Sequence, residues 1–513
     1  MVKSSSNINN KQYNNRIKKI VIVGGGTAGW MAASALAKML GSDFSHIYLI
    51  ESDDIGTIGV GEATIPHIGS FNNILGLDEN EFVKKTQATF KLGIKFNNWG
   101  QVGESYIHPF GDFGSDMPNG VPFHHYWLKL FQSNNEDLFH YSMEVQACKQ
   151  GKFSRPLSIK NSPLARIAYA FHLDAGLYAA YLRKFSENHG VHRIEGKIVS
   201  VQLREDTGFI QSVTLENSQS IEGDLFIDCS GFRGLLIKES LNTGYIDWSH
   251  LLPCDRAVTV ASQSSCELLP YTQATAQTAG WQWRIPLQHR TGNGHVYCSQ
   301  YMSEDEATAT LLNNLDGDAI SEPKTLAFNT GRRKKFWNKN CVALGLSGGF
   351  MEPLESTSIY LIQSGISKLL ALFPDKSFSA ANSDKYNQLL ALEYERIRDF
   401  LILHYWANQR SDEQFWSACQ QIPIPNYLAE KVRLYKESGR IYRQDDELFS
   451  TSSWLAVFHG QNIMADSYHP LVDTHDLGSI QKDLSHIRKT LERCASSMPS
   501  HNQFIMKNCA SEK

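Results

Sequence analysis

Residues 18–29 read KKIVIVGGGTAG and decide the fold. The run IVIV has the apolar content of a buried strand, GGGTAG is typical of a turn, and the following WMAASALAKML has the Ala, Leu and Met content of a helix. A second apolar strand, IYLIE at 47–51, comes next. The order strand, helix, strand predicts a βαβ unit with its glycines at the first crossover, and therefore a Rossmann-like α/β fold.

The glycines at 24, 26 and 29 form GxGxxG, with Thr27 and Ala28 inside the loop. In this setting Gly24 permits a tight turn, Gly26 lets a pyrophosphate approach the backbone, and Gly29 allows close packing of the helix. Glu51 closes the second strand, where an acid can hold a ribose 2′-OH. The pattern predicts a dinucleotide site, although the motif alone does not separate FAD from NAD.

Two later segments favour FAD. GDLFIDCSGFRG at 223–234 and NCVALGLSGGFMEP at 340–353 each read as a strand followed by a glycine-rich turn. They resemble the elements that flavoprotein monooxygenases and their relatives place around the flavin.

The remaining chain divides into three parts by composition. Residues 1–17 are Ser- and Asn-rich and are predicted to be a mobile tail, and 18–385 to be the FAD-binding core, with a substrate and β-sheet region interleaved at about 90–200 and 240–335. The segment FKLGIKF, 90–96, alternates like a half-buried strand with its lysines on the polar face, and 196–221 reads as a β-meander. From residue 386 to 513 the pattern turns helical, which predicts a C-terminal helical subdomain or cap.

Composition excludes several classes of protein. The 513 residues carry 49 Lys and Arg against 53 Asp and Glu, which disfavours a nucleic-acid partner. The apolar stretch 20–40 is interrupted by glycines, so we expect neither a membrane span nor a secretory signal. Nine cysteines without a CxxC pair indicate neither a metal site nor a disulfide framework, and a reducing cytoplasm is the simplest location.

Five motifs in order carry a more specific resemblance: GGGTAGWMAA at 24–33, GVGEATIP at 59–66, FKLGIKFNNW at 90–99, GWQWRIP at 280–286 and EPLEST at 352–357. Together they resemble the flavin-dependent tryptophan halogenase family, of which the element Trp281-x-Trp283-x-Ile285-Pro286 is a mark. The resemblance implies an FAD-binding, three-layer fold of the flavoprotein monooxygenase type, with an added β-sheet and a mainly helical C-terminal substrate cap. It also implies FAD contacts from Ile58, Val60, Glu62, Ala63, Ile198, Leu346 and Ile359.

The chemistry that this resemblance implies is divided between two chambers. FADH2 reacts with O2 to give a flavin hydroperoxide, chloride or bromide attacks it, and hypohalous acid travels through a short tunnel to a small aromatic substrate. Trp281 and Trp283 would form the wall between flavin and substrate. No second nucleotide fold for NAD(P)H is visible, so a separate NAD(P)H-dependent flavin reductase is expected as partner; a homodimer is an open alternative to a monomer.

The resemblance assigns catalytic roles to two residues. Lys91 matches the lysine that holds or reacts with the hypohalous acid, whereas periodicity alone does not choose between Lys91 and Lys95. A lysine near a dry pocket can have a depressed pKa. Glu355 matches the carboxylate opposite the lysine, where it could polarise the halogenating species or accept the ring proton.

The halide site is expected just beyond Glu355. Ser356 and Thr357 read as the N-cap of a helix, and the family binds halide at the amides matching Thr357 and Ser358. The second position is commonly Gly in the family. If that glycine needs a positive φ, Ser358 would alter the halide pocket and the preference between chloride and bromide.

The substrate is less closely defined. His108 and Phe110 fall where the family stacks the substrate ring, and the C-terminal cap offers Phe449 and Trp454 where tryptophan halogenases carry paired tyrosines. Without that grip, free tryptophan is a doubtful substrate, and an indolic or phenolic molecule is at least as plausible. Two rival readings stay open: an FAD-dependent aromatic monooxygenase (hydroxylase) that puts oxygen on carbon, and a non-catalytic flavin- or partner-binding protein.

Overall fold

The predicted βαβ unit lies at the centre of the fold. The computed structural model describes residues 15–55, 61–115, 117, 120–264, 267–444 and 447–511. Strand β1 (Lys19–Val23) pairs in parallel with β2 (His46–Glu51), and helix α2 (Thr27–Leu40) connects them. The complete sheet has the order β20 (Trp337–Asn338), β21 (Cys341–Ala343), β12 (Leu225–Asp228), β1, β2 and β8 (His192–Glu195). Only the edge pair β20–β21 among these six strands is antiparallel.

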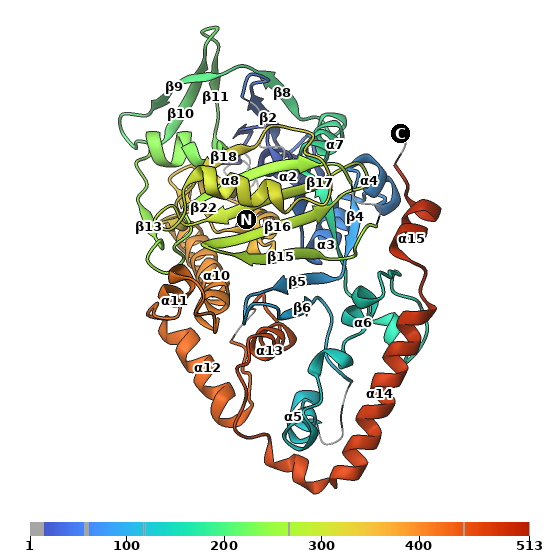
Figure 1. Ribbon diagram of the computed structural model, residues 1–513. Helices are drawn as coiled ribbons and strands as arrows, with labels where there is room; N and C mark the ends of the chain where they lie inside the picture. Colours follow the sequence, from blue (N-terminus) through green and yellow to red (C-terminus); the bar gives the residue numbers. More distant parts are fainter. Residues whose placement is uncertain are drawn as a thin grey trace, which may run out of the picture.

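Alternate residues of β1 enter two different cores, which explains why the whole strand is apolar. Ile20 and Ile22 join the core beneath α2, whereas Val21 and Val23 join the core under the antiparallel meander β9 (Ile198–Leu203), β10 (Ile210–Leu215) and β11 (Ser220–Glu222). Helix α2 also packs against α7 (Ala175–Asn188) and α9 (Ser358–Ala371). Helices, parallel sheet and meander form the three layers, so the three-layer fold and the predicted meander are confirmed (Figure 1).

A second large sheet lies beside this body. Its order is β18 (Lys324–Ala327), β14 (Arg256–Ser262), β17 (Thr291–Tyr297), β16 (Gly280–Pro286), β15 (Thr272–Gln277), β5 (Gly93–Asn97) and β6 (Ser105–Pro109). Two small sheets flank it: β3 (Gly61–Ala63), β7 (Ala170–Asp174) and β4 (Thr89–Lys91), and β13 (Tyr245–Asp247), β19 (Gly331–Arg333) and β22 (Gly349–Phe350). Helices α3 (His67–Leu75), α4 (Glu79–Lys85) and α8 (Glu304–Asn313) pack around these sheets.

The prediction of one half-buried strand over 90–96 is wrong. The chain leaves β4 at Lys91 and enters β5 at Gly93, because Leu92 donates its N–H to Pro270 O and accepts from Phe110 N instead of continuing the ladder of β7. The two strands therefore belong to different sheets. As a consequence Lys91, predicted on a polar face, is completely buried.

Beyond β22 the chain is helical, apart from short loops. Helices α10 (Ala380–Trp406), α11 (Gln414–Cys419), α12 (Asn426–Ser438), α13 (Thr451–Gly460), α14 (Leu477–Ser497) and α15 (His501–Asn508) follow α9. In Figure 1 helices α12, α13 and α14 lie below β5 and β6 together with α5 (Phe123–Asn134), and α6 (Met143–Lys149) lies beside β6. Helix α13 packs directly on β6 and thus closes that edge of the large sheet.

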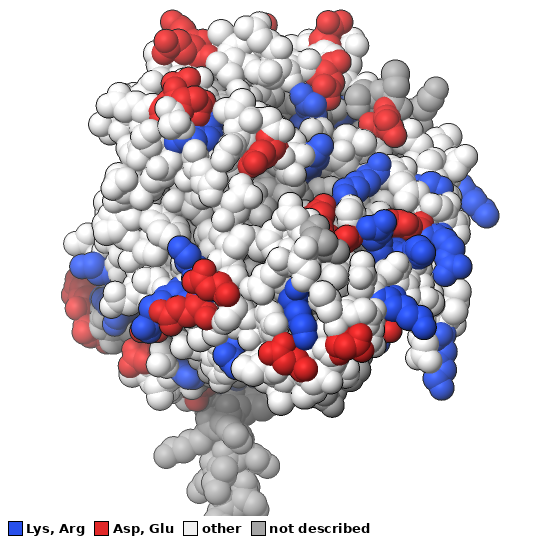
Figure 2. All heavy atoms as spheres, turned by 60° about the horizontal axis from the view of Figure 1, so that its bottom comes forward, with Lys and Arg blue, Asp and Glu red and all other residues white. Residues whose placement is uncertain are grey.

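The surface and the beginning of the chain add two observations. On the face drawn in Figure 2 both signs of charge occur among mainly uncharged residues, in keeping with a net charge of −4. Within the described ranges, no helix is long and apolar enough to cross a bilayer. Most of the predicted tail lies outside the described residues, but Ile17 at its end is buried and its carbonyl accepts a hydrogen bond from Ser45.

Candidate active site

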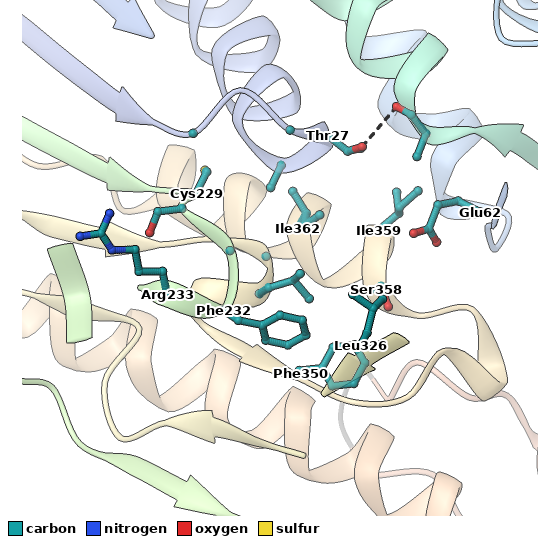
Figure 3. A pocket seen from close by; sticks show the side chains of 18 of the residues that line it. Thr27, Glu62, Cys229, Phe232, Arg233, Leu326, Phe350, Ser358, Ile359 and Ile362 are labelled. Carbon is teal, nitrogen blue, oxygen red and sulfur yellow. Dashed lines mark hydrogen bonds between the residues drawn. The ribbon is translucent and has the colours of Figure 1, made fainter. Parts of the chain in front are cut away.

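A pocket of about 870 Å³ opens beside the glycine turn at the carboxyl end of β1. Its walls come from α2, β3, β16, the turn after β12 and the start of α9, and Figure 3 shows Thr27, Glu62, Phe232, Ser358 and Ile359 around it. The volume is at the upper end of the range for pockets that enclose a small-molecule ligand. Of the predicted FAD contacts it is lined by Gly24, Gly26, Thr27, Ala28, Glu51, Glu62, Ala63, Ile198, Leu346 and Ile359. Ile58 and Val60 lie outside the described residues.

The glycine turn fits a dinucleotide because it leaves no space for side chains. Gly24 has φ +109°, and a Cβ atom there would lie 2.3 Å from Cys229 O. At Gly29 a Cβ would lie 1.9 Å from Gly24 O, so this glycine serves close helix packing and does not line the pocket. A ligand phosphate can therefore approach the backbone and the N-terminus of α2 directly.

Glu51 is held in place at the end of β2. Arg193 Nε donates to Glu51 Oε1 at 2.6 Å, and a Cβ atom at Gly25 would lie 1.5 Å from Glu51 Oε2. The carboxylate thus lies against the glycine turn, where it can accept a ribose hydroxyl. Together the cradle, the pocket and this acid fit FAD.

Gly24→Ala is expected to weaken FAD binding by about 100-fold or more, because the new methyl group meets backbone and the residue must keep a positive φ. The measurement is a fluorescence titration of the purified protein with FAD. Gly69→Ala is the matched control, since a Cβ at this helical glycine meets nothing within 4 Å. Equal FAD affinity of both variants would contradict the assignment of the turn.

The two tryptophans that are predicted to form a wall lie on one face of β16. Trp281 and Trp283 are both buried, and both line the pocket. Behind them Glu352 Oε2 accepts hydrogen bonds from Trp281 Nε1 at 2.7 Å and from the Tyr405 hydroxyl at 2.6 Å. Burial raises the pKa of Glu352 to about 7, against the effect of these two hydrogen bonds. The acid therefore anchors Trp281 from behind.

Lys91 lies next to the pocket without lining it. Its Nζ donates to Ser356 Oγ at 2.8 Å and to Thr64 O at 3.1 Å, and it lies 5.0 Å from the centre of the Phe110 ring. Ser356 does line the pocket, so its side chain lies between the amine and that space. Burial lowers the pKa of Lys91 to about 7, although Glu355 acts in the opposite direction. The amine can thus exist in either protonation state near neutral pH.

Glu355 is held between two histidines. It is 1% exposed, and His108 Nδ1 lies 2.9 Å from its Oε2, while His404 Nε2 lies 2.8 Å from its Oε1. Burial alone would raise the pKa of Glu355, but His108 and His404 outweigh burial and keep the pKa below its usual value of 4.5. Glu355 is therefore a carboxylate at neutral pH, and not an ordinary solvent-exposed capping acid.

The helix after Glu355 begins as predicted, but its cap differs. Helix α9 has Thr357 in the N-cap position, the Thr357 side chain makes no capping hydrogen bond, and Ser356 adopts a positive φ of 59°. The predicted N-cap at Ser356 and Thr357 is thus confirmed in position for Thr357, but Ser356 does not cap the helix because its Oγ accepts from Lys91. Ser358 is the first helical residue and has no positive φ, so serine there strains no backbone. Thr357 and Ser358 both line the pocket, with the amides of the helix start open to an anion.

The predicted substrate residues lie in two environments. Phe110 is near Lys91, and His108, predicted to stack on substrate, bonds to Glu355. Phe449 stacks on Phe400 at 3.8 Å between ring centres and lies 6.3 Å from the His108 ring. Trp454 is 1% exposed and packs edge-on against Phe400 at 4.9 Å. The cap thus places Phe449 beside His108, which contacts Glu355, and the substrate contacts stay predictions.

Sequence reasoning missed Glu352 and His404 and misread Ser356. Glu352 stands in the motif EPLEST, but the motif predicts no role for it, because nothing in a sequence shows that its carboxyl group is buried behind Trp281. His404 lies in the run YNQLLALEYERIRDFLILHY, where a single histidine on an apolar helix face carries no signal. Their roles become visible only in three dimensions.

A nucleotide cradle, a tryptophan wall and a buried lysine beside a paired carboxylate define an enzyme of the flavin-dependent halogenase class. The family model described as tryptophan halogenase matches residues 19–476, and the chain belongs to that family. It is 34% identical to the tryptophan 6-halogenase SttH of Streptomyces toxytricini, over 95% of this chain and 97% of that protein. It is 32% identical to the tryptophan 7-halogenase RebH of Lentzea aerocolonigenes, over 96% and 98% of the two chains.

Solved structures of flavin-dependent halogenases are similar over nearly the whole chain. BrvH from Brevundimonas sp. BAL3 superposes with a TM-score of 0.93 at 44% identity, covering 96% of this chain and 99% of that one. Xcc4156 from Xanthomonas campestris gives a TM-score of 0.93 at 45% identity, covering 97% and 99%. The fold and the enzyme class expected from the motifs are thereby confirmed.

Proposed function

We propose that the protein is an FADH2-dependent halogenase that uses O2 and chloride or bromide to halogenate an aromatic carbon of an electron-rich, indole-like substrate. One observation carries the proposal: the Lys91 amine is buried and is divided from the nucleotide pocket by Ser356. Such an arrangement lets an oxidised halogen species pass to a lysine while the organic substrate stays away from the cofactor.

FAD would be held by the glycine turn, Glu51 and the walls of the pocket described above. When bound in its reduced form it supplies the reaction of O2 with halide that yields hypohalous acid. The open amides at Thr357 and Ser358 favour an anion there, because a helix N-terminus carries partial positive charge. Trp281, held by Glu352, fills the wall between this pocket and the substrate side.

Lys91 would hold or react with the hypohalous acid and direct it at the ring, and Glu355 would polarise it or accept the ring proton. The carboxylate suits this task because it is ionised and dry, so its charge acts on nearby groups with little screening. His108 orients it from one side and His404 from the other.

The cap favours a neutral aromatic substrate over a free amino acid. SttH and RebH are named as tryptophan halogenases, but here the cap offers Phe449 and Trp454. Next to Trp454 the charge of Lys431 is already paired with Glu447, at 3.1 Å, and both side chains are 3% exposed. A pair satisfied in this way offers little to the ammonium and carboxylate of tryptophan, whereas an indole needs only aromatic contacts.

The test is a product assay with a separate NAD(P)H-dependent flavin reductase, FAD and O2. Indole, tryptophan and phenols are each incubated with bromide, with chloride or without halide, and products are read by mass spectrometry. We expect halogen-bearing indole products that require halide. A product heavier by one oxygen in every condition would establish the hydroxylase instead, and complete inactivity of FAD-loaded protein would favour a non-catalytic role.

A further inference from the structure

Glu355 lies at the end of a line of buried side chains of which the roles above use only His404. Gln461 Nε2 donates to the Tyr106 oxygen at 3.1 Å, and the Tyr106 hydroxyl lies 3.1 Å from His404 Nδ1. His404 Nε2 in turn lies 2.8 Å from Glu355 Oε1. The line joins the end of α13, strand β6 and helix α10, and each of its four residues is at most 4% exposed.

The two ends of this line determine the direction of every hydrogen bond in it. An amide nitrogen only donates, and a carboxylate only accepts. Because Gln461 donates to the Tyr106 oxygen, the Tyr106 O–H is left to donate to His404 Nδ1. A neutral imidazole that accepts at Nδ1 carries its proton on Nε2, which is the nitrogen facing Glu355.

The surroundings of His404 favour the neutral ring. Phe96 stacks on it at 4.6 Å and Trp99 meets it edge-on at 5.8 Å. Burial lowers the pKa of His404; the neighbouring His108 acts in the same direction and Glu355 in the opposite one. The ionisable groups that face the ring are thus Glu355, His108 and Tyr106.

We propose that Gln461 and Tyr106 hold His404 as a neutral Nε2–H donor, which makes all three positioning residues for Glu355. This proposal rests on the proposed function, because it takes from there the catalytic role of Glu355. A neutral imidazole orients a carboxylate without cancelling its charge, whereas an imidazolium would form an ion pair with it. The charge of Glu355 thereby stays available to Lys91 and to the ring proton. His404 Nε2 lies 2.8 Å from Glu355 Oε1 and has no other partner among the described residues, although its N–H is not directed squarely at that oxygen.

The first experiment needs neither cofactor nor substrate. Protein labelled with 15N in its histidines is studied by NMR, and the His404 signals are assigned by their loss in His404→Gln. At pH 7 we expect a neutral ring protonated on Nε2. An imidazolium, or a ring protonated on Nδ1, would overturn the proposal.

The second experiment reverses one end of the line. In Gln461→Glu the new carboxylate accepts a hydrogen bond where the amide donated one, so the Tyr106 O–H turns toward it. His404 Nδ1 must then donate to the Tyr106 oxygen. With both ring nitrogens protonated, His404 is expected to be an imidazolium at pH 7. Gln461→Leu is the matched variant that removes the donor without adding an acceptor. The Tyr106 hydroxyl can then donate to Nδ1 or accept from it, so His404 should stay neutral but populate both its Nε2–H and its Nδ1–H tautomers. An unchanged His404 spectrum in Gln461→Glu, with the fold intact by circular dichroism, would refute the direction of the line.

The catalytic readout separates this proposal from the proposed function. Gln461→Glu should lower kcat for halogenation by about 10- to 100-fold and change its pH profile, with FAD affinity unchanged, whereas Gln461→Leu, which adds no charge, should lower kcat by less than about 10-fold and leave the pH dependence in place. Normal kcat and pH profile in Gln461→Glu would overturn the positioning role. If the unsubstituted protein halogenates nothing but shows the neutral Nε2–H ring, the proposed function fails while the hydrogen-bond line stands.

Discussion

Lys91→Ala is expected to bind FAD and to oxidise reduced flavin at the normal rate, yet to form at least about 100-fold less halogenated product. The reason is positional: the amine lies outside the walls of the nucleotide pocket, so its removal leaves the cradle intact. What is lost is the group between Ser356 and Phe110 that would guide the hypohalous acid. The measurements are FAD affinity, stopped-flow oxidation of reduced flavin, and product yield by mass spectrometry.

Lys95→Ala is the matched control for this prediction. Lys95 lies on the neighbouring strand β5 and is partly exposed. In the alternating pattern of residues 90–96 it falls on the same predicted face as Lys91. Its removal should leave product yield within about twofold of normal, as for most surface substitutions. Thermal melts of both variants separate loss of chemistry from loss of fold. Normal product yield from Lys91→Ala would refute the catalytic assignment.

The pH dependence of the same step follows from the pKa of about 7 for Lys91. The group is an ammonium below this value and an amine above it. If the ammonium holds hypohalous acid by donating hydrogen bonds, product formation falls as the pH rises through 7; if the amine reacts with it, product formation rises over the same range. A pH profile of product yield per reduced flavin, at constant flavin oxidation rate, decides between these two roles.

The nucleotide site could be predicted from the sequence because its determinants are local. Strand, glycine turn, helix and terminal acid lie within residues 19–51, and each has a conformational requirement that a short stretch reveals. The same holds for the helix after Glu355, whose apolar spacing predicts its buried face. These features would be expected of any chain with the same local pattern.

The catalytic region could not be derived from local patterns, because tertiary packing overrides them there. Alternation placed Lys91 and Lys95 on one polar face, but the break at Leu92 sends only Lys91 into the interior. His108 bonds to Glu355 across 247 residues of sequence, and His404 arrives from a third element. Contacts between residues this far apart leave no periodic pattern in the sequence. This part of the site can therefore be identified only from a family resemblance or from the three-dimensional structure.

Glu355→Gln is expected to slow halogenation by about 100-fold or more at pH 7, while FAD binding and reduced-flavin oxidation continue. Gln keeps the size of the side chain but removes the charge, and a positioned acid or base typically accounts for a factor of this order. His108 and His404 would then face an amide in place of the carboxylate that accepts from His108 and lies 2.8 Å from His404 Nε2. The measurement is product formation in a single turnover, in which the enzyme itself generates the hypohalous acid from reduced FAD, O2 and halide.

Glu393 in helix α10 offers a matched control for the substitution of Glu355. Glu393 is another partly buried carboxylate, paired with Lys368 at 2.9 Å, but it does not line the pocket or contact Lys91. Glu393→Gln should lower thermal stability slightly and leave the halogenation rate unchanged. Equal rates for Glu355→Gln and the unsubstituted protein would reduce Glu355 to a structural residue.

The substitution of Glu355 also has a consequence at Lys91 that a purely structural role would not produce. The negative charge of Glu355 raises the pKa of Lys91 and so opposes the effect of burial. When that charge is removed, burial acts alone, and the pKa of Lys91 must fall below about 7. In the pH profile of the residual activity of Glu355→Gln, the limb that reports the titration of Lys91 should therefore lie at a lower pH than in the unsubstituted enzyme. A limb that stays in place would mean that the two charges do not interact, and the paired lysine and carboxylate would have to be treated as separate sites.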